Sequence, residues 1–143
     1  GQAAPHRKAP QRNTRSTMVL RTVSTRRKIL LVDDSALVRA VVVHALSASG
    51  FEVSTADDPR RIDEAVANNR PDLLLVDATF PGVTDDMLVE TLARHVPALP
   101  VVIFSDRAEA EIRQLVERSG ARGFVPKDGA TLAERLTPFL AVS

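Results

Sequence analysis

The sequence predicts an α/β fold in which one parallel sheet lies between two layers of helices. Short apolar segments rich in branched residues alternate five times with segments whose apolar residues are spaced as on one face of a helix. Four of the short segments are apolar throughout, which is typical of parallel strands that helices cover on both faces. These four are residues 29–32, 73–76, 101–104 and 124–126.

The first helix and the second strand follow the strand at residues 29–32. Ser35 is placed to cap a helix, and Gly50 is placed to end it. Residues 51–55 alternate between apolar and polar side chains, as in a half-covered strand at the edge of a sheet. The apolar stripe predicted for this helix comprises Leu37, Val38, Val41, Val42, Ala45 and Leu46.

The later helices carry their own start and stop signals. The second and third helices are expected to start at two capping residues, and the fourth to end at a glycine. These residues are Asp58 (followed by Pro59), Thr84 and Gly120. The fifth helix is expected from about residue 129 to residue 140, with Pro138 kinking or shortening it.

This order of elements indicates a (βα)5 chain, in which right-handed crossovers place helices on both faces of the sheet. We therefore predict a three-layer, flavodoxin-like, doubly wound parallel sheet with strand order 2-1-3-4-5. That order puts the alternating second strand at an edge and leaves the fully apolar first, third and fourth strands in the centre.

Composition and charge narrow the class of protein. The chain of 143 residues is long enough for one domain with a core, and its lack of cysteine excludes disulfides and thiolate metal sites. Eight basic residues and no acidic residue lie in residues 1–28, so the overall charge of +1 leaves −7 for the rest. Nucleic-acid binding by so acidic a domain is not expected.

The same asymmetry predicts the domain organisation. Residues 1–26 are polar and basic and are expected to be a disordered tail, whereas residues 27–143 are expected to form the folded domain. One interpretation of the tail is that Met18 is the native start. No apolar stretch has the length of a membrane span or of a secretory signal, so a cytoplasmic protein is the expectation.

Polar side chains follow the four apolar strands at the points where these strands end. They are Asp33 and Asp34, Asp77, Ser105, and Lys127. In an open parallel sheet the ligand site lies outside the carboxyl ends of the strands, so these side chains should meet at one edge. Carboxylates that lie together repel one another unless a cation joins them. A divalent metal and a phosphoryl group would use every member of this set.

Four segments that contain these residues, ILLVDDS, LLLVDATFPG, VVIFSD and GFVPKD, resemble the receiver domain of bacterial two-component response regulators. The resemblance covers about residues 27–141. It implies that Asp77 accepts a phosphoryl group and that Asp33 and Asp34 hold Mg²⁺. The further roles that it implies are a backbone carbonyl ligand to the metal at Thr79, phosphoryl contacts at Lys127 and Ser105, and switch positions at Ser105 and Phe124.

The resemblance also implies the partners and the activity. A sensor histidine kinase or a phosphotransfer protein would supply the phosphoryl group, and a downstream protein or output domain would read the changed conformation. The face formed by the fourth helix, fifth strand and fifth helix would contact that output partner. Such a domain is a phospho-acceptor in a phosphorelay that catalyses its own phosphotransfer and loses the group slowly, and it is not otherwise an enzyme.

Two residues depart from the usual receiver pattern. Asp106 stands where receivers have a small residue, so it would either cap the fourth helix or repel the incoming phosphoryl group. Asp128 replaces the proline that usually follows the lysine through a cis bond. We therefore expect a trans bond between Lys127 and Asp128, and the Asp128 carboxylate could compete for the lysine charge.

Two other functions compete with that of a phospho-accepting receiver. The first is a pseudo-receiver that binds partners without being phosphorylated, which Asp106 and Asp128 favour and the intact set of site residues opposes. The second is a metal-dependent phosphatase on a related fold. Thr79 stands where such an enzyme would need a second catalytic aspartate, which opposes this function.

Overall fold

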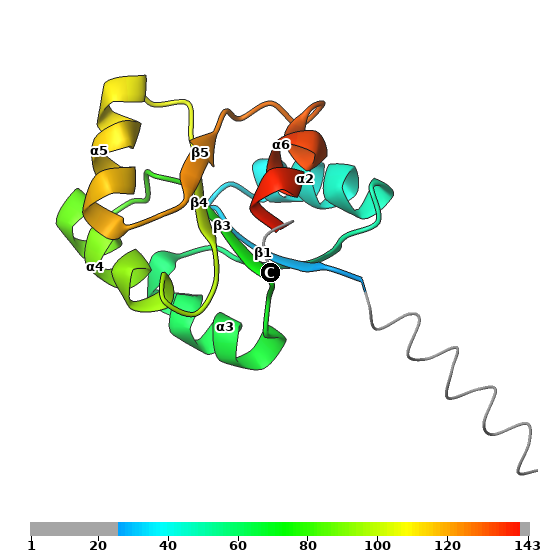
Figure 1. The fold of residues 1–143 in the computed structure, drawn as a ribbon, viewed down its shortest axis with the longest axis horizontal. Helices are drawn as coiled ribbons and strands as arrows, with labels where there is room; N and C mark the ends of the chain where they lie inside the picture. The colour runs from blue at the N-terminus through cyan, green and yellow to red at the C-terminus, as the bar shows by residue number, and fades with distance from the viewer. Residues whose placement is uncertain (1–25, 141–143) are drawn as a thin grey trace, which may run out of the picture.

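Five parallel strands form the central sheet in the order β2-β1-β3-β4-β5, as predicted (Figure 1). The structure is a computed structural model, and it describes residues 26–140. The predicted tail therefore lies outside the described residues except for Arg26. The strands are β1 (Lys28–Val32), β2 (Glu52–Ala56), β3 (Leu73–Val76), β4 (Val101–Phe104) and β5 (Gly123–Val125).

Helices cover both faces of this sheet. They are α2 (Ala36–Ala48), α3 (Ile62–Asn69) after the short 3₁₀ turn η2 (Pro59–Arg61), α4 (Asp85–His95), α5 (Glu109–Ser119) and α6 (Leu132–Leu140). In Figure 1, α2 and α6 lie on one face and α3, α4 and α5 on the other. Alternate residues of β1 point to the two faces, so Ile29 and Leu31 join the core under α2 and α6, whereas Leu30 and Val32 join the other core.

The predicted caps fix the helix ends. Ser35 Oγ accepts a hydrogen bond from the Val38 N–H at 3.2 Å, and Thr84 Oγ1 accepts one from the Met87 N–H at 3.1 Å. Asp58 caps η2 rather than the α-helix itself. Gly120 ends α5 with a φ of +84°, a left-handed conformation that glycine adopts without strain.

Three predictions about the helices were wrong. On α2 only Val42 and Leu46 are buried, while Leu37 is 74% and Val41 51% exposed. The N-cap of α5 is Ala108, without a side-chain cap bond, so Asp106 does not cap this helix. Helix α6 starts at Leu132 instead of residue 129, and it continues through Pro138 to Leu140.

Within residues 26–140, no helix combines the length and the apolar character that a membrane crossing requires.

Candidate functional site

The register of the strands brings the predicted site residues to one edge of the sheet. Val32 pairs with Val76, and the Asp77 N–H donates to the Val32 carbonyl at 2.9 Å. The Ser105 N–H donates to the Val125 carbonyl at 3.3 Å, which places Ser105 beside the end of β5. Each polar residue begins where its buried strand stops, so the parallel pairing alone gathers these residues.

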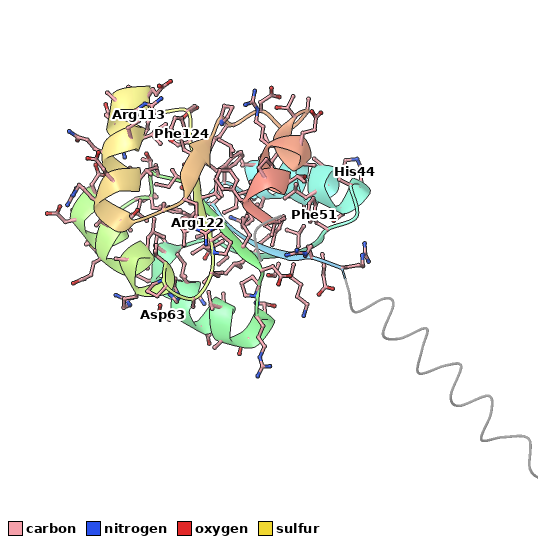
Figure 2. The ribbon with its side chains drawn as sticks, viewed as in Figure 1. His44, Phe51, Asp63, Arg113, Arg122 and Phe124 are labelled. Atoms are coloured by element: carbon pink, nitrogen blue, oxygen red, sulfur yellow. The ribbon has the colours of Figure 1, made fainter. Side chains whose placement is uncertain are left out.

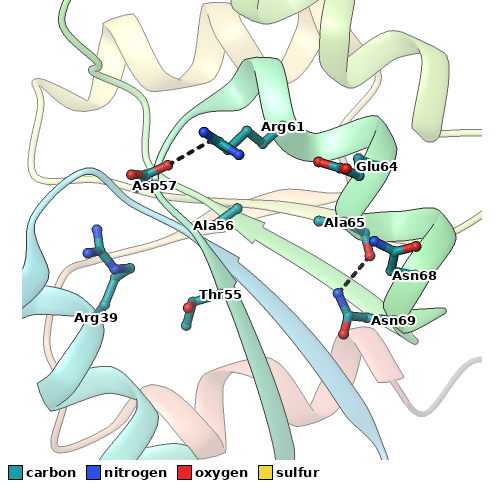
Figure 3. Close-up of a pocket in the computed structure, with 9 residues that line it drawn as sticks. All are labelled: Arg39, Thr55, Ala56, Asp57, Arg61, Glu64, Ala65, Asn68 and Asn69. Atoms are coloured by element: carbon teal, nitrogen blue, oxygen red, sulfur yellow. Dashed lines mark hydrogen bonds and ion pairs between the residues drawn. The ribbon is translucent and has the colours of Figure 1, made fainter.

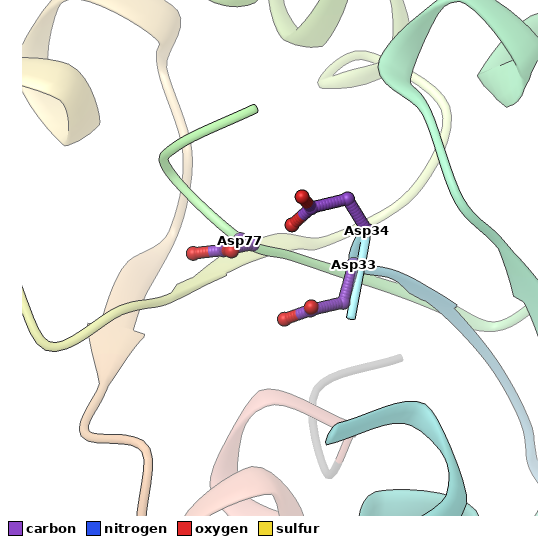
Figure 4. A group of neighbouring side chains, drawn as sticks. All are labelled: Asp33, Asp34 and Asp77. Atoms are coloured by element: carbon purple, nitrogen blue, oxygen red, sulfur yellow. The ribbon is translucent and has the colours of Figure 1, made fainter. Parts of the chain in front are cut away.

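Three carboxylates form the centre of this edge (Figure 4). Asp33, Asp34 and Asp77 each offer one oxygen, and these oxygens lie within 4.8 Å of one another. Asp33 is fully buried and Asp77 nearly so, while Asp34 is exposed. Asp33 Oδ1 accepts a hydrogen bond from the Ser35 N–H at 2.9 Å, and Asp77 Oδ1 accepts one from the Ala78 N–H at 2.7 Å.

The Lys127 ammonium supplies a positive charge beside two of these carboxylates. Its Nζ lies 3.1 Å from Asp33 Oδ2 and 3.2 Å from Asp77 Oδ2, and it stands 5.4 Å from the centre of the Phe104 ring. Burial disfavours the charged lysine, but the attraction of Asp77 and Asp33 outweighs burial and raises the pKa of Lys127. Lys127 therefore stays protonated at neutral pH.

Burial has the opposite effect on the aspartate at the end of β3. Loss of solvent raises the pKa of Asp77, and the Asp33 charge adds to this, while Lys127 and the Ala78 N–H oppose it. A carboxylate with a raised pKa is a stronger base and a better nucleophile than an ordinary one.

The donor set fits a divalent cation that prefers oxygen ligands. Asp33 Oδ2 is buried, and the Lys127 ammonium lies beside it. Within residues 26–140, this oxygen accepts no hydrogen bond. Three carboxylates that face one volume are the hard ligands that Mg²⁺ binds while it keeps several waters. An added cation would satisfy the open oxygen and relieve the repulsion between the carboxylates.

Ser105 and Thr79 lie next to this cluster in different surroundings. Ser105 is buried, and its Oγ accepts a hydrogen bond from the Arg107 N–H at 3.1 Å. No hydrogen bond joins Ser105 to Asp77 in residues 26–140. Thr79 is exposed, two residues after Asp77. The phosphoryl and metal contacts expected of these two residues stay predictions.

Asp128 has its own local partners. Its carboxylate accepts hydrogen bonds from the Ala130 N–H at 3.1 Å and from Thr131 Oγ1 at 3.4 Å, whereas Lys127 pairs with Asp33 and Asp77. Asp128 therefore does not compete for the lysine charge in this structure. No peptide bond among the described residues is cis, so the bond before Asp128 is trans, as predicted.

Phe124 lies half-buried on β5, at the edge of the sheet. The Arg113 guanidinium of α5 stands over its ring, 5.5 Å from the centroid (Figure 2). This ring packs against the core beneath α3, α4 and α5. The switch role expected of Phe124 stays a prediction.

Asp106 is exposed beside Ser105 and caps nothing, which leaves repulsion as its predicted effect. We expect Asp106→Ala to speed phosphorylation by a small anionic phosphodonor about twofold to fivefold, because like charges about 4 Å apart in water repel by about 1 kcal/mol. The measurement is the initial rate at low and high ionic strength. Salt screens exposed charges, so the gain should shrink at high salt, and an unchanged rate at low salt would contradict the repulsion.

Sequence reasoning missed two arginines at this edge. Arg39 of α2 donates to the Asp33 carbonyl at 2.7 Å and so fixes the backbone beside the cluster. Arg107 donates to the Ala78 carbonyl at 3.2 Å and to Asp85 on α4. No motif or periodicity in the sequence marks either arginine as a site residue. The sequence shows only how many positions separate each arginine from an aspartate or from Ser105.

Arg39 also borders a polar pocket over β2 and α3 (Figure 3). Charged and amide groups in this pocket have partners close by, since Arg61 lies 3.6 Å from Asp57 and Asn69 donates to the Ala65 carbonyl at 2.8 Å. The pocket contributes no side chain to the three-carboxylate cluster.

Comparisons with known proteins agree with this geometry. A family model described as the response regulator receiver domain matches residues 29–137. The DNA-binding transcriptional regulator NtrC of Escherichia coli is 29% identical over 99 residues, which are 69% of this chain and 21% of that protein. The transcriptional regulatory protein CseB of Streptomyces avermitilis is 33% identical over 114 residues, which are 78% of this chain and 48% of that protein.

Solved structures show the same architecture. The chemotaxis protein CheY4 of Vibrio cholerae superposes with a TM-score of 0.72 at 28% identity, covering 80% of this chain and 99% of that chain. The BeF3-activated receiver domain of Klebsiella pneumoniae RstA shares the fold, with a TM-score of 0.70 at 23% identity over 80% of this chain and 99% of that chain.

The matched segment contains β2 to β5, β1 from Ile29 onward, and every residue of the carboxylate and lysine cluster. The fold has the strand order that the pattern of apolar segments predicted. The chain therefore belongs to the response regulator receiver domain family, a family of signalling phospho-acceptors with an acidic metal-site cluster next to the accepting aspartate.

Proposed function

We propose that this domain accepts a phosphoryl group on Asp77 in the presence of Mg²⁺ and thereby switches the conformation that a partner reads. The observation that supports this most is the buried Asp77 carboxylate, which lies between a lysine ammonium at 3.2 Å and two further carboxylates. The nucleophile, the lysine ammonium and the carboxylates that would bind the metal therefore lie around the same space at the edge of the sheet.

In the reaction, an Asp77 carboxylate oxygen attacks phosphorus, an O–P bond forms, and the bond from phosphorus to the donor's imidazole nitrogen breaks. The imidazole nitrogen keeps the electron pair of that bond. Lys127 would contact the phosphoryl oxygens and offset the charge that collects there. Phosphoryl transfer depends mainly on such positioning and charge neutralisation.

Asp33, Asp34 and Asp77 would hold the Mg²⁺, with the backbone carbonyl of Thr79 as a further ligand. The bound ion would neutralise phosphoryl oxygens and hold the donor group in line with the nucleophile. Asp33 Oδ2 supports this assignment, because this buried acceptor has the Lys127 ammonium beside it but no hydrogen bond from any residue of 26–140.

The phosphoryl group adds about −2 charge and new acceptor oxygens. Ser105 would donate its hydroxyl hydrogen to one of these oxygens, and Phe124 would change rotamer as the end of β4 moves. Only contacts that differ between the two states can shift their populations, and the new oxygens provide such contacts.

The partners that we propose are a histidine kinase or phosphotransfer protein as donor and an output partner as reader. An apolar patch of α2, Leu37 and Val41, is exposed beside Lys127 and Gly129 and would suit a donor that must bring its histidine to Asp77. The output partner would bind over α5, β5 and α6, where a groove runs along residues Arg113, Val116, Glu117, Arg122, Gly123 and Phe124. We expect this exchange to take place in the cytoplasm.

The chain spans about a fifth of the length of NtrC and about half of CseB. Our proposal for this chain is therefore the receiver function alone.

Amide NMR spectra recorded with Mg²⁺, before and after addition of beryllofluoride, test this function. Beryllofluoride mimics the phosphoryl group on an aspartate. We expect shifts at Asp77, Ser105 and Lys127 that continue along α5 to Phe124. Shifts with Mg²⁺ that stay at Asp33 and Asp34, without any response to beryllofluoride, would contradict a phospho-switch and favour a pseudo-receiver.

A further inference from the structure

Arg107 joins the two loops that border the phosphoryl site. It lies in the loop between β4 and α5, two residues after Ser105. Its Nη1 and Nη2 atoms donate to Asp85 Oδ1 and Oδ2, both at 3.1 Å, in a two-pronged arrangement that only arginine can make. Its Nε donates to Glu111 Oε1 at 2.9 Å, on the helix α5 that follows this loop.

The same guanidinium also reaches the backbone next to the phosphoryl acceptor. Nη1 donates to the carbonyl of Ala78, the residue after Asp77, at 3.2 Å. The Arg107 side chain is 23% exposed, so water screens these contacts only in part. One side chain thus ties the loop after β4 to the loop after β3 and to the first residue of α4.

A second ion pair between the same two helices provides a comparison. Arg118 near the end of α5 pairs with Asp86 on the first turn of α4. Within residues 26–140, Arg118 makes no hydrogen bond or ion pair with the site loops. The two pairs share their chemistry and their helices, and only the Arg107 pair contacts the site.

The main chain of Arg107 holds Ser105 directly. The Arg107 N–H donates to Ser105 Oγ at 3.1 Å, and Ser105 has no hydrogen bond to Asp77. A hydroxyl that is to donate to a phosphoryl group on Asp77 must move with its loop. That movement would change the geometry of the Arg107 contacts with Asp85 and with the Ala78 carbonyl, because these partners belong to α4 and to the other loop.

We propose that the Arg107–Asp85 ion pair is a latch that restrains Ser105 in the unphosphorylated protein, so that Arg107 is a positioning residue for the switch. This inference rests on the proposed receiver function. In the wild type, activation requires free energy to disturb this ion pair. A variant that lacks the pair needs no such free energy. The phosphoryl mimic should then bind more tightly, even if the fold becomes less stable.

The test measures the dissociation constant of beryllofluoride in the presence of Mg²⁺, by NMR titration of the Ser105 and Phe124 amides. The variants are Arg107→Gln, Asp85→Asn, the double variant, and Arg118→Gln as the matched control. An ion pair of this partly exposed kind is worth up to about 1 kcal/mol, so we expect Arg107→Gln and Asp85→Asn to bind about twofold to fivefold more tightly.

The double variant should bind no more tightly than Arg107→Gln alone, because both changes cut one interaction. Arg118→Gln should match the wild type. A parallel thermal melt separates the latch from plain damage, since a merely structural residue would lower the melting temperature without tightening the ligand. Equal or weaker binding in both single variants would overturn the latch.

The two proposals fail in different ways. If the wild type ignores beryllofluoride altogether, the receiver function fails and the latch fails with it. If the wild type responds and Arg107→Gln and Asp85→Asn behave like it, the receiver function stands and the latch alone is wrong.

Discussion

Asp77→Asn should abolish phosphoryl incorporation from both a small phosphodonor and a histidine kinase, while the domain stays folded. The amide has nearly the size of the carboxylate but lacks the negative charge and the nucleophilic oxygen that attack on phosphorus requires. Incorporation of labelled phosphate, measured with and without Mg²⁺, tests this. Asp57→Asn is the matched control, because Asp57 follows β2 at the same edge of the sheet and stands outside the cluster.

A phosphorylated Asp77→Asn protein would show that another residue accepts the group. Asp33 and Asp34 are the carboxylates to examine next, because they lie in the same cluster. Loss of phosphorylation in Asp57→Asn as well would indicate a general effect of charge removal at this edge and not a nucleophile.

The same substitution should raise stability in the metal-free protein. The pKa of Asp77 is raised in the folded state, above the ordinary value of 3.8, so the folded state binds a proton more readily than the unfolded chain does. The proton's contribution to stability is thus present at pH below 3.8 and is lost as pH rises through the raised value. Urea unfolding should show Asp77→Asn more stable than wild type at neutral pH, with a smaller difference in acid.

The edge of the sheet where the site lies could be predicted because burial and pairing fix it. A fully apolar segment must end where the chain meets water, and parallel pairing aligns those ends, as the Val32–Val76 register shows. Asp33, Asp77, Ser105 and Lys127 then meet without any further information. The edge position of β2 followed from its alternating pattern in the same way.

Contacts between loops and between helices could not be predicted from such patterns. Asp106 has the sequence of a cap, but the helix begins after Ala108. Arg107 instead reaches Asp85 on α4 and the Ala78 carbonyl on the loop after β3. The Arg107–Asp85 pair spans 22 residues, and no periodicity signals it. The apolar stripe predicted for α2 was wider than the face that is buried. Helices α2 and α6 share one face of the sheet, and the packed core reaches only part of each helix.

Lys127→Gln should slow phosphorylation about 10²–10³-fold, the usual cost of removing one fixed group that stabilises charge at a reacting centre. The glutamine keeps a polar side chain of similar reach but no charge, so the phosphoryl oxygens lose their ammonium. Asp33 and Asp77 lose it too, and two buried carboxylates would then repel each other without a counter-charge. The variant should therefore melt at a lower temperature than the wild type. Mg²⁺ should raise the melting temperature of the variant by more than it raises that of the wild type.

Lys28→Gln is the control for this change, since Lys28 is the other lysine of residues 26–140 and starts β1 at the opposite end of the strand. A Lys127→Gln protein that is phosphorylated at the wild-type rate would mean that the metal alone neutralises the phosphoryl group. In that case the ammonium at 3.2 Å from Asp77 would serve stability only, and the rescue by Mg²⁺ would be the sole effect left to measure.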